Sequence, residues 1–143
     1  MSPQERFRVA RERLGLSQDE LANRIGINAP SIWDVECIEG ELTECYSPKE
    51  VVSYCKALEI GPAELFGKSD EPSGITEDHL LELIQMECRN RGMTLSQFGD
   101  VVGWNLEAAA ETADGLLGDL SVDGLQSLCK ELRIDWRRVL IAL

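Results

Sequence analysis

The chain has 143 residues, enough for one ordinary domain or two very small ones. Hydrophobic residues make up 43% and charged residues 28%, which is typical of a folded globular protein rather than a disordered one. Acidic residues outnumber basic residues 26 to 14, giving a net charge of −12. This charge argues against a general binder of nucleic acids or anionic membranes, because both polyanions would repel the chain.

No apolar run approaches the ~20 residues that a membrane-spanning helix needs. The N-terminus also lacks the charged-then-apolar pattern of a signal peptide. The five cysteines are odd in number and include no Cys-x-x-Cys pair. We therefore expect a cytoplasmic protein with free thiols, since disulfides persist mainly in oxidising compartments.

A linker is predicted near the middle of the chain. The segment Gly67–Gly74 contains two glycines and one proline but no large apolar side chain. It favours two domains, 1–67 and 76–143, separated by a linker at 68–75. Segments this short bury little apolar surface alone, so we expect the two halves to pack on each other.

The two halves also resemble each other in sequence. Residues 15–27 align without a gap on residues 92–104. After a three-residue difference in loop length, residues 47–60 align on residues 121–134. An internal duplication is the simplest explanation of this pattern.

Local signals are helical in both halves. Capping boxes are predicted at Ser2, Ser17, Ser47 and Thr94, where a hydroxyl accepts a backbone N–H and an acid or amide three residues later reaches back. No segment shows the sustained alternation of a strand, so the predicted fold class is all-α. The predicted helices cover residues 3–14, 18–25, 29–37, 48–58, 62–66, 76–91, 95–102, 106–114, 122–132 and 136–142.

The segment Gln18–Cys37 has the spacing of a helix-turn-helix. Ala22 is small enough for two helices to cross closely, and Gly26 can adopt the positive φ of the turn. Ile32 and Val35 are spaced to face inward from the second helix. The second half places Gly99, Gly103, Ala109 and Thr112 at these four positions.

The stretch Leu16–Ile27 (LSQDELANRIGI), together with Val51–Phe66, resembles the Cro/C1-type (XRE) helix-turn-helix family. The second half resembles the same family as a degenerate copy. The resemblance implies tandem five-helix lambda-repressor-like units packed together. It also implies sequence-specific DNA binding, with contacts made by Gln18, Asn28, Ser31 and Trp33.

The charge of the implied DNA-facing surface opposes that function. From Ile25 to Pro48 there is no Lys or Arg, although DNA-binding surfaces gain much of their affinity from phosphate contacts. Trp33 is predicted on the solvent side of its helix, where it either anchors an interface or packs on the adjacent loop or the other half. We therefore expect this surface to bind a basic protein through Trp33, Asp34, Glu36, Glu39, Glu41 and Glu44.

The loop Glu36–Ser47 is longer than the family's usual link, and it is acidic. Ile38, Leu42 and Tyr46 are interleaved with its acids. Two interpretations remain open for these three apolar residues. They either cover the core or form part of a patch for the partner.

Three functional hypotheses follow. Small acidic proteins of this kind resemble immunity proteins or antitoxins, which would make the basic partner a toxin. The alternative is a transcriptional regulator whose N-terminal half binds DNA as a dimer. A metal- or thiol-dependent sensor would need a bound metal or a redox-sensitive Cys37–Cys45 pair. No enzyme and no cofactor or metal site is predicted, because no nucleophile–base pair, phosphate loop or metal-ligand spacing stands out.

Overall fold

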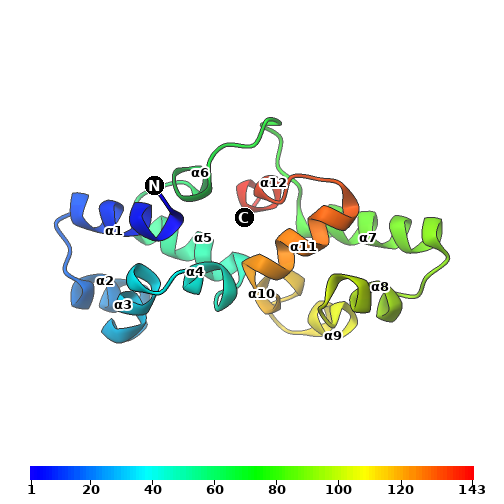
Figure 1. Cartoon of the computed structure of the whole chain (residues 1–143), viewed down its shortest axis with the longest axis horizontal. Coiled ribbons are helices and arrows are strands. Elements are labelled where there is room, and N and C mark those ends of the chain that lie inside the picture. The colour runs from blue at the N-terminus through cyan, green and yellow to red at the C-terminus, as the bar shows by residue number, and fades with distance from the viewer.

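The computed structural model describes all residues, Met1–Leu143, as twelve α-helices with no strand (Figure 1). The all-α prediction is therefore confirmed. The helices are α1 (Pro3–Arg13), α2 (Gln18–Ile25), α3 (Ala29–Cys37), α4 (Glu41–Glu44), α5 (Pro48–Ala57), α6 (Pro62–Phe66), α7 (Glu77–Arg91), α8 (Leu95–Val102), α9 (Leu106–Glu111), α10 (Leu116–Asp119), α11 (Val122–Leu132) and α12 (Arg137–Ile141). None of them combines the length and apolar character that spanning a membrane would require.

Side-chain caps set where most of these helices begin. Ser17, Ser47 and Thr94 each form the full capping box that the sequence predicts. At Ser2 only half of the box is present, because the Ser2 hydroxyl accepts the Glu5 N–H without a reciprocal bond. Each cap satisfies a backbone donor that the helix itself leaves unpaired, which explains why capping signals locate these helix starts well.

Two short helices, α4 and α10, lie in segments that the sequence analysis left as loops. Each follows a glycine with positive φ, Gly40 at 82° and Gly115 at 77°. A four-residue helix is too short to show a 3.6-residue apolar period, so the sequence pattern gives no signal for it. Leu42 in α4 is nevertheless buried and anchors that turn to the core.

Helix α9 is shorter than predicted, and this changes the role of Thr112. We expected Thr112 to face inward with Ala109. Ala109 is fully buried, but α9 ends at Glu111 and Thr112 is exposed, with its hydroxyl donating to the Ala109 carbonyl. The expectation for Thr112 was wrong because the chain leaves the helix one residue before it.

Helix α8 requires a very small residue at Gly99, where the turn that follows the helix passes close to it. A Cβ on Gly99 would lie 2.6 Å from the Trp104 carbonyl oxygen, so only glycine allows this close approach. Ala22 takes the corresponding place in α2, where it is buried. The small residues singled out in the sequence therefore do bring their helices close together.

The structure contains two apolar cores that share residues across the middle of the chain. Val122 of α11 belongs to the core built by α1–α6, and Val52 of α5 belongs to the core built by α7–α12. The Val122 N–H also donates to the Tyr46 carbonyl. The two halves are therefore packed on each other rather than independent.

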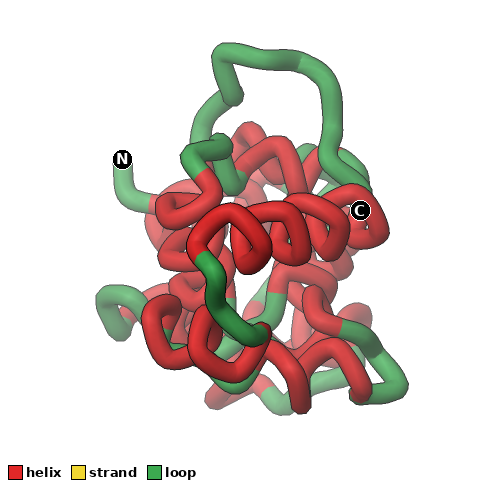
Figure 2. Tube along the Cα trace, turned by 90° about the vertical axis from the view of Figure 1, so that its right-hand side faces the viewer, coloured by secondary structure: helices red, strands yellow, loops and turns green.

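The connecting segment arches above the helices in the view of Figure 1, and Figure 2 shows the helices joined by loops. Residues 67–74 are mostly exposed, as expected of a linker. Ile75, which we predicted to end the linker, is instead buried, and its N–H donates to the Arg138 carbonyl. The linker is therefore tied to α12 at its C-terminal end.

The shared cores predict that a residue of the second half stabilises the first. Val122→Ala should lower the free energy of unfolding by about 2 kcal/mol, because it removes two fully buried methyl groups. Val101→Ala is the matched control, since Val101 is 46% exposed and its loss should change stability by less than about 0.5 kcal/mol. Urea unfolding followed by circular dichroism measures both. Equal effects of the two substitutions would contradict a shared core.

Candidate interaction surface

Helix α3 presents one face to the core and another to solvent. Gly26 ends α2 with φ of 90°, and the Asn28 side chain then accepts the Ser31 N–H to begin α3. Ile32 and Val35 are fully buried, whereas Trp33 is 52% exposed. The predicted orientation of α3 is confirmed, and Trp33 is available as an apolar contact on its outer face.

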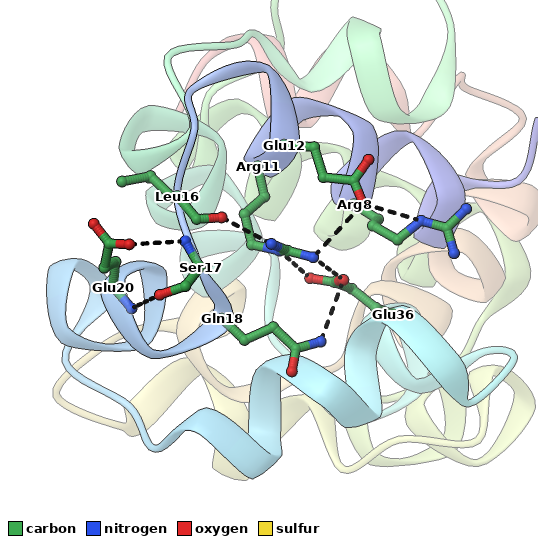
Figure 3. Close-up of polar contacts among 8 residues, drawn as sticks. All are labelled: Arg8, Arg11, Glu12, Leu16, Ser17, Gln18, Glu20 and Glu36. Atoms are coloured by element: carbon green, nitrogen blue, oxygen red, sulfur yellow. Dashed lines mark hydrogen bonds and ion pairs between the residues drawn. The ribbon is translucent and has the colours of Figure 1, made fainter.

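Glu36 lies inside the protein rather than on the acidic surface. Its carboxylate accepts two 2.8 Å bonds from Arg11 of α1, and Gln18 of α2 donates a third at 3.4 Å (Figure 3). The Arg11 guanidinium also donates to the Leu16 carbonyl at 2.8 Å. Glu36 was expected to contact a partner, but it is 6% exposed and fully paired, so it does not belong to the surface a partner can reach.

This ion pair joins the first three helices. Hydrogen bonds from Arg11 to Glu36 raise the pKa of the arginine, which stays charged at any relevant pH. The paired geometry matters because an unpaired buried carboxylate is strongly destabilising. Glu36 therefore has a structural role that Arg11, 25 residues earlier, makes possible.

The remaining predicted acids gather around α4. Glu39 and Glu44 are exposed, while Asp34 and Glu41 are half-buried. Local desolvation of the thiol, a side-chain hydrogen bond with Glu41 and the negative charges of Glu41, Glu44 and Asp34 all raise the pKa of Cys45. Helix α3, which carries Asp34, also contacts α4 directly. We call Trp33, Asp34, Glu39, Glu41 and Glu44 the first acidic surface.

The three apolar residues of the acidic loop have different positions. Leu42 is buried, and Tyr46 is half-buried with its ring edge-on to Tyr54, 5.3 Å between centroids. Ile38 is 44% exposed. Two of the three thus cover the core, and Ile38 remains on the surface close in sequence to Glu39.

The residues implied for DNA contact are mostly engaged within the chain. The Gln18 amide donates to Glu36, and the Asn28 side-chain oxygen accepts both the N–H and the hydroxyl of Ser31. Trp33 is the one member of the set for which no such polar contact is present. Binding DNA through Gln18 or Ser31 would require these internal bonds to be exchanged.

The cysteines divide into exposed and buried groups, and all five are free. Burial raises the pKa of Cys55 and of Cys129 to about 12, so both thiols stay protonated at neutral pH and pack as small apolar groups. Cys37 and Cys45 are exposed. No cluster of three or more metal-ligating side chains is found in the structure.

Comparison with known proteins finds no matching family model, no matching curated protein and no matching solved structure. The resemblance to the XRE family therefore rests on the sequence pattern quoted above.

The buried ion pair yields a stability prediction. Glu36→Ala should lower the free energy of unfolding by about 3 kcal/mol or more, because it leaves the Arg11 charge partly buried without its partner. Replacing both residues, as in Arg11→Met with Glu36→Leu, should recover much of that loss. Glu39→Ala serves as the exposed control and should change stability by less than about 0.5 kcal/mol. Urea unfolding measures the free energy of unfolding of all three variants. A Glu36→Ala effect as small as that of the control would contradict the structural role.

Proposed function

We propose that the chain consists of two lambda-repressor-like helix-turn-helix units, residues 1–67 and 76–143, and acts as a non-enzymatic binding protein for a basic protein partner. Matching caps support the duplication. Asn28 and Asn105 begin α3 and α9, while Ser47 and Ser121 begin α5 and α11. Glu59 and Arg133, 74 residues apart in the alignment, even share the same unusual φ of 59°.

One observation carries the binding proposal: an exposed tryptophan stands among carboxylates on a stretch that contains no base. Between Ile25 and Pro48 every formal charge is negative. A basic partner would be steered to such a surface, since complementary charge accelerates encounter and excludes wrong partners. Trp33 supplies an apolar anchor of the type that dominates many interfaces. An immunity protein or antitoxin, whose partner is a basic toxin, fits this description.

Charge reversal tests the surface. The immobilised chain is used to capture basic proteins from lysate. The association rate of the captured protein is then measured with the unmodified chain and with the variant Glu39→Lys/Glu44→Lys. We expect association to slow by about tenfold at low salt and to lose much of its dependence on ionic strength, because steering is a long-range charge effect. Dissociation should change less.

Glu5→Lys/Glu82→Lys is the matched control, since both glutamates are exposed and lie on α1 and α7. The control makes the same change in net charge. If it slows association as much as Glu39→Lys/Glu44→Lys does, net charge rather than the first acidic surface governs binding, and the site assignment is wrong.

A second candidate function is transcriptional regulation through DNA binding. The arrangement of α3 and α9 favours it, because both helices lie along the lower side of the molecule in Figure 1, as a pair of recognition helices would. The contacts would come from Gln18, Asn28, Ser31 and Trp33 on the first half.

Selection from a randomised duplex pool at about 50 mM salt tests this alternative. A sequence-specific regulator should enrich a palindromic site, and affinity should fall steeply between about 50 and 200 mM salt. Under our main proposal no site is enriched, because the first acidic surface repels phosphate. Enrichment that is lost in Ser31→Ala would favour the regulator and overturn the main proposal.

A further inference from the structure

The contacts between the two halves are reciprocal. Helix α4 of the first half packs on α11 of the second, and α10 of the second packs on α5 of the first. Helix α6 packs on its counterpart α12, where Phe66 meets Trp136 edge-on at 5.1 Å. In a two-fold interface, each contact between two elements is repeated by their counterparts in the other half. The pairs α4–α11 and α10–α5 are related in this way, since α10 is the counterpart of α4 and α11 that of α5. The single chain therefore has the layout of a symmetric dimer.

Carboxylates recur at structurally equivalent positions of the two halves. Asp34 and Glu111 are the sixth residues of α3 and α9. Glu39 and Asp114 each precede the glycine that begins α4 and α10, namely Gly40 and Gly115. The last residues of these two short helices are Glu44 and Asp119.

At all three pairs of positions Asp and Glu have exchanged while the charge has stayed, although the surrounding sequence differs. We call Glu111, Asp114 and Asp119, all exposed, the second acidic surface. It too lies in a stretch without bases, since no Lys or Arg occurs between Arg91 and Lys130. The repeated feature is therefore charge itself rather than residue identity.

The helices that carry the two acidic surfaces lie along one side of the molecule. Figure 1 shows α3, α4, α10 and α9 in this order along its lower edge. A groove of about 550 Å³ lies between the halves, lined by Ile27 and Tyr54 of the first half and by Asp114 of the second, which is the one residue of the acidic surfaces in its lining. Lys49 lines the groove, and its ammonium group donates to the Asp114 carbonyl. Because the helices that carry both surfaces lie along the same edge, a single partner that spans the boundary between the halves could contact both.

We infer that the two acidic surfaces fit one two-fold-symmetric basic protein, a homodimer that places one basic face on each half of this chain. This inference rests on the proposed function and specifies the partner. Binding both faces at once makes the second contact intramolecular, which raises the affinity far above that of a single face. The pseudo-two-fold axis of the chain supplies the matching geometry, so one chain binds one partner dimer.

Defined peptides test the inference without a natural partner. The probes are a decalysine peptide and two such peptides joined by Gly/Ser linkers of three lengths. For the unmodified protein, the joined peptide should bind about 100-fold tighter than the single peptide, with a stoichiometry of one to one. The gain should be largest at one linker length, since effective concentration peaks when the linker matches the span. Isothermal titration calorimetry at low salt measures both quantities.

Neutralising one surface at a time locates the effect. Asp34→Asn/Glu39→Gln/Glu44→Gln and Glu111→Gln/Asp114→Asn/Asp119→Asn should each abolish the gain from joining while single-peptide binding persists on the other surface. The matched control is Glu5→Gln/Asp78→Asn/Glu82→Gln, which removes three exposed charges from α1 and α7 and should keep the gain. Circular dichroism establishes that each variant is folded.

The outcomes separate the two proposals. Two joined peptides bind about twofold tighter than one for statistical reasons alone, because either end can bind. If single peptides bind through the acidic surfaces but joining them adds no more than this factor, the symmetric partner is ruled out and the proposed function stands. If the control triple lowers single-peptide binding as much as either surface triple, the acidic surfaces are not the binding site and both proposals fail.

Discussion

Packing between the two halves of the chain determines how the two acidic surfaces lie relative to each other. Val122 completes the core of the first half and Val52 that of the second, so neither half closes its core without the other. Reciprocal contacts of α4 with α11 and of α10 with α5 then fix the relative orientation of the halves. Because α4 and α10 also carry acidic residues, the same packing that stabilises the fold sets the spacing of the two acidic surfaces.

Glutamates only a few residues apart have different roles because one is buried and the others are exposed. Glu36 is shielded from water and forms an ion pair with Arg11, and this pair joins α1 to α3. Glu39 and Glu44 keep their water and have no ion-pair partner in the chain, so their field extends into solvent. A buried pair contributes little to long-range attraction because its charges cancel, whereas solvated carboxylates act over roughly a Debye length of ~8–10 Å. The exposed acids, not Glu36, determine what the surface attracts.

The sequence was most informative where structure is local. Capping residues act within one turn of backbone, and side-chain caps begin eight of the ten helices that the sequence located, all except α6 and α12. The short helices α4 and α10 were not predicted, because four residues show no apolar period. The pair Arg11–Glu36 was not predicted either, because the pattern of α1 alone does not show which residue of α3 packs against it. The orientation of Trp33 followed from spacing, but the pairing of the two acidic surfaces depends on contacts between the halves.

The two acidic surfaces share charge but not an apolar anchor. The position of α9 equivalent to Trp33 is Ala110, which is exposed and offers only a methyl group. Charge chiefly sets the rate of encounter, whereas a desolvated aromatic anchor chiefly sets residence time. In the proposed complex both halves would attract a basic dimer, the first more strongly because Glu41 gives it a fourth acid where the second has Leu116. The half that carries Trp33 would also hold its subunit longer. Charge is therefore repeated on the two halves while the exposed tryptophan is present on one, so the proposed steering would be shared and the proposed anchoring would not.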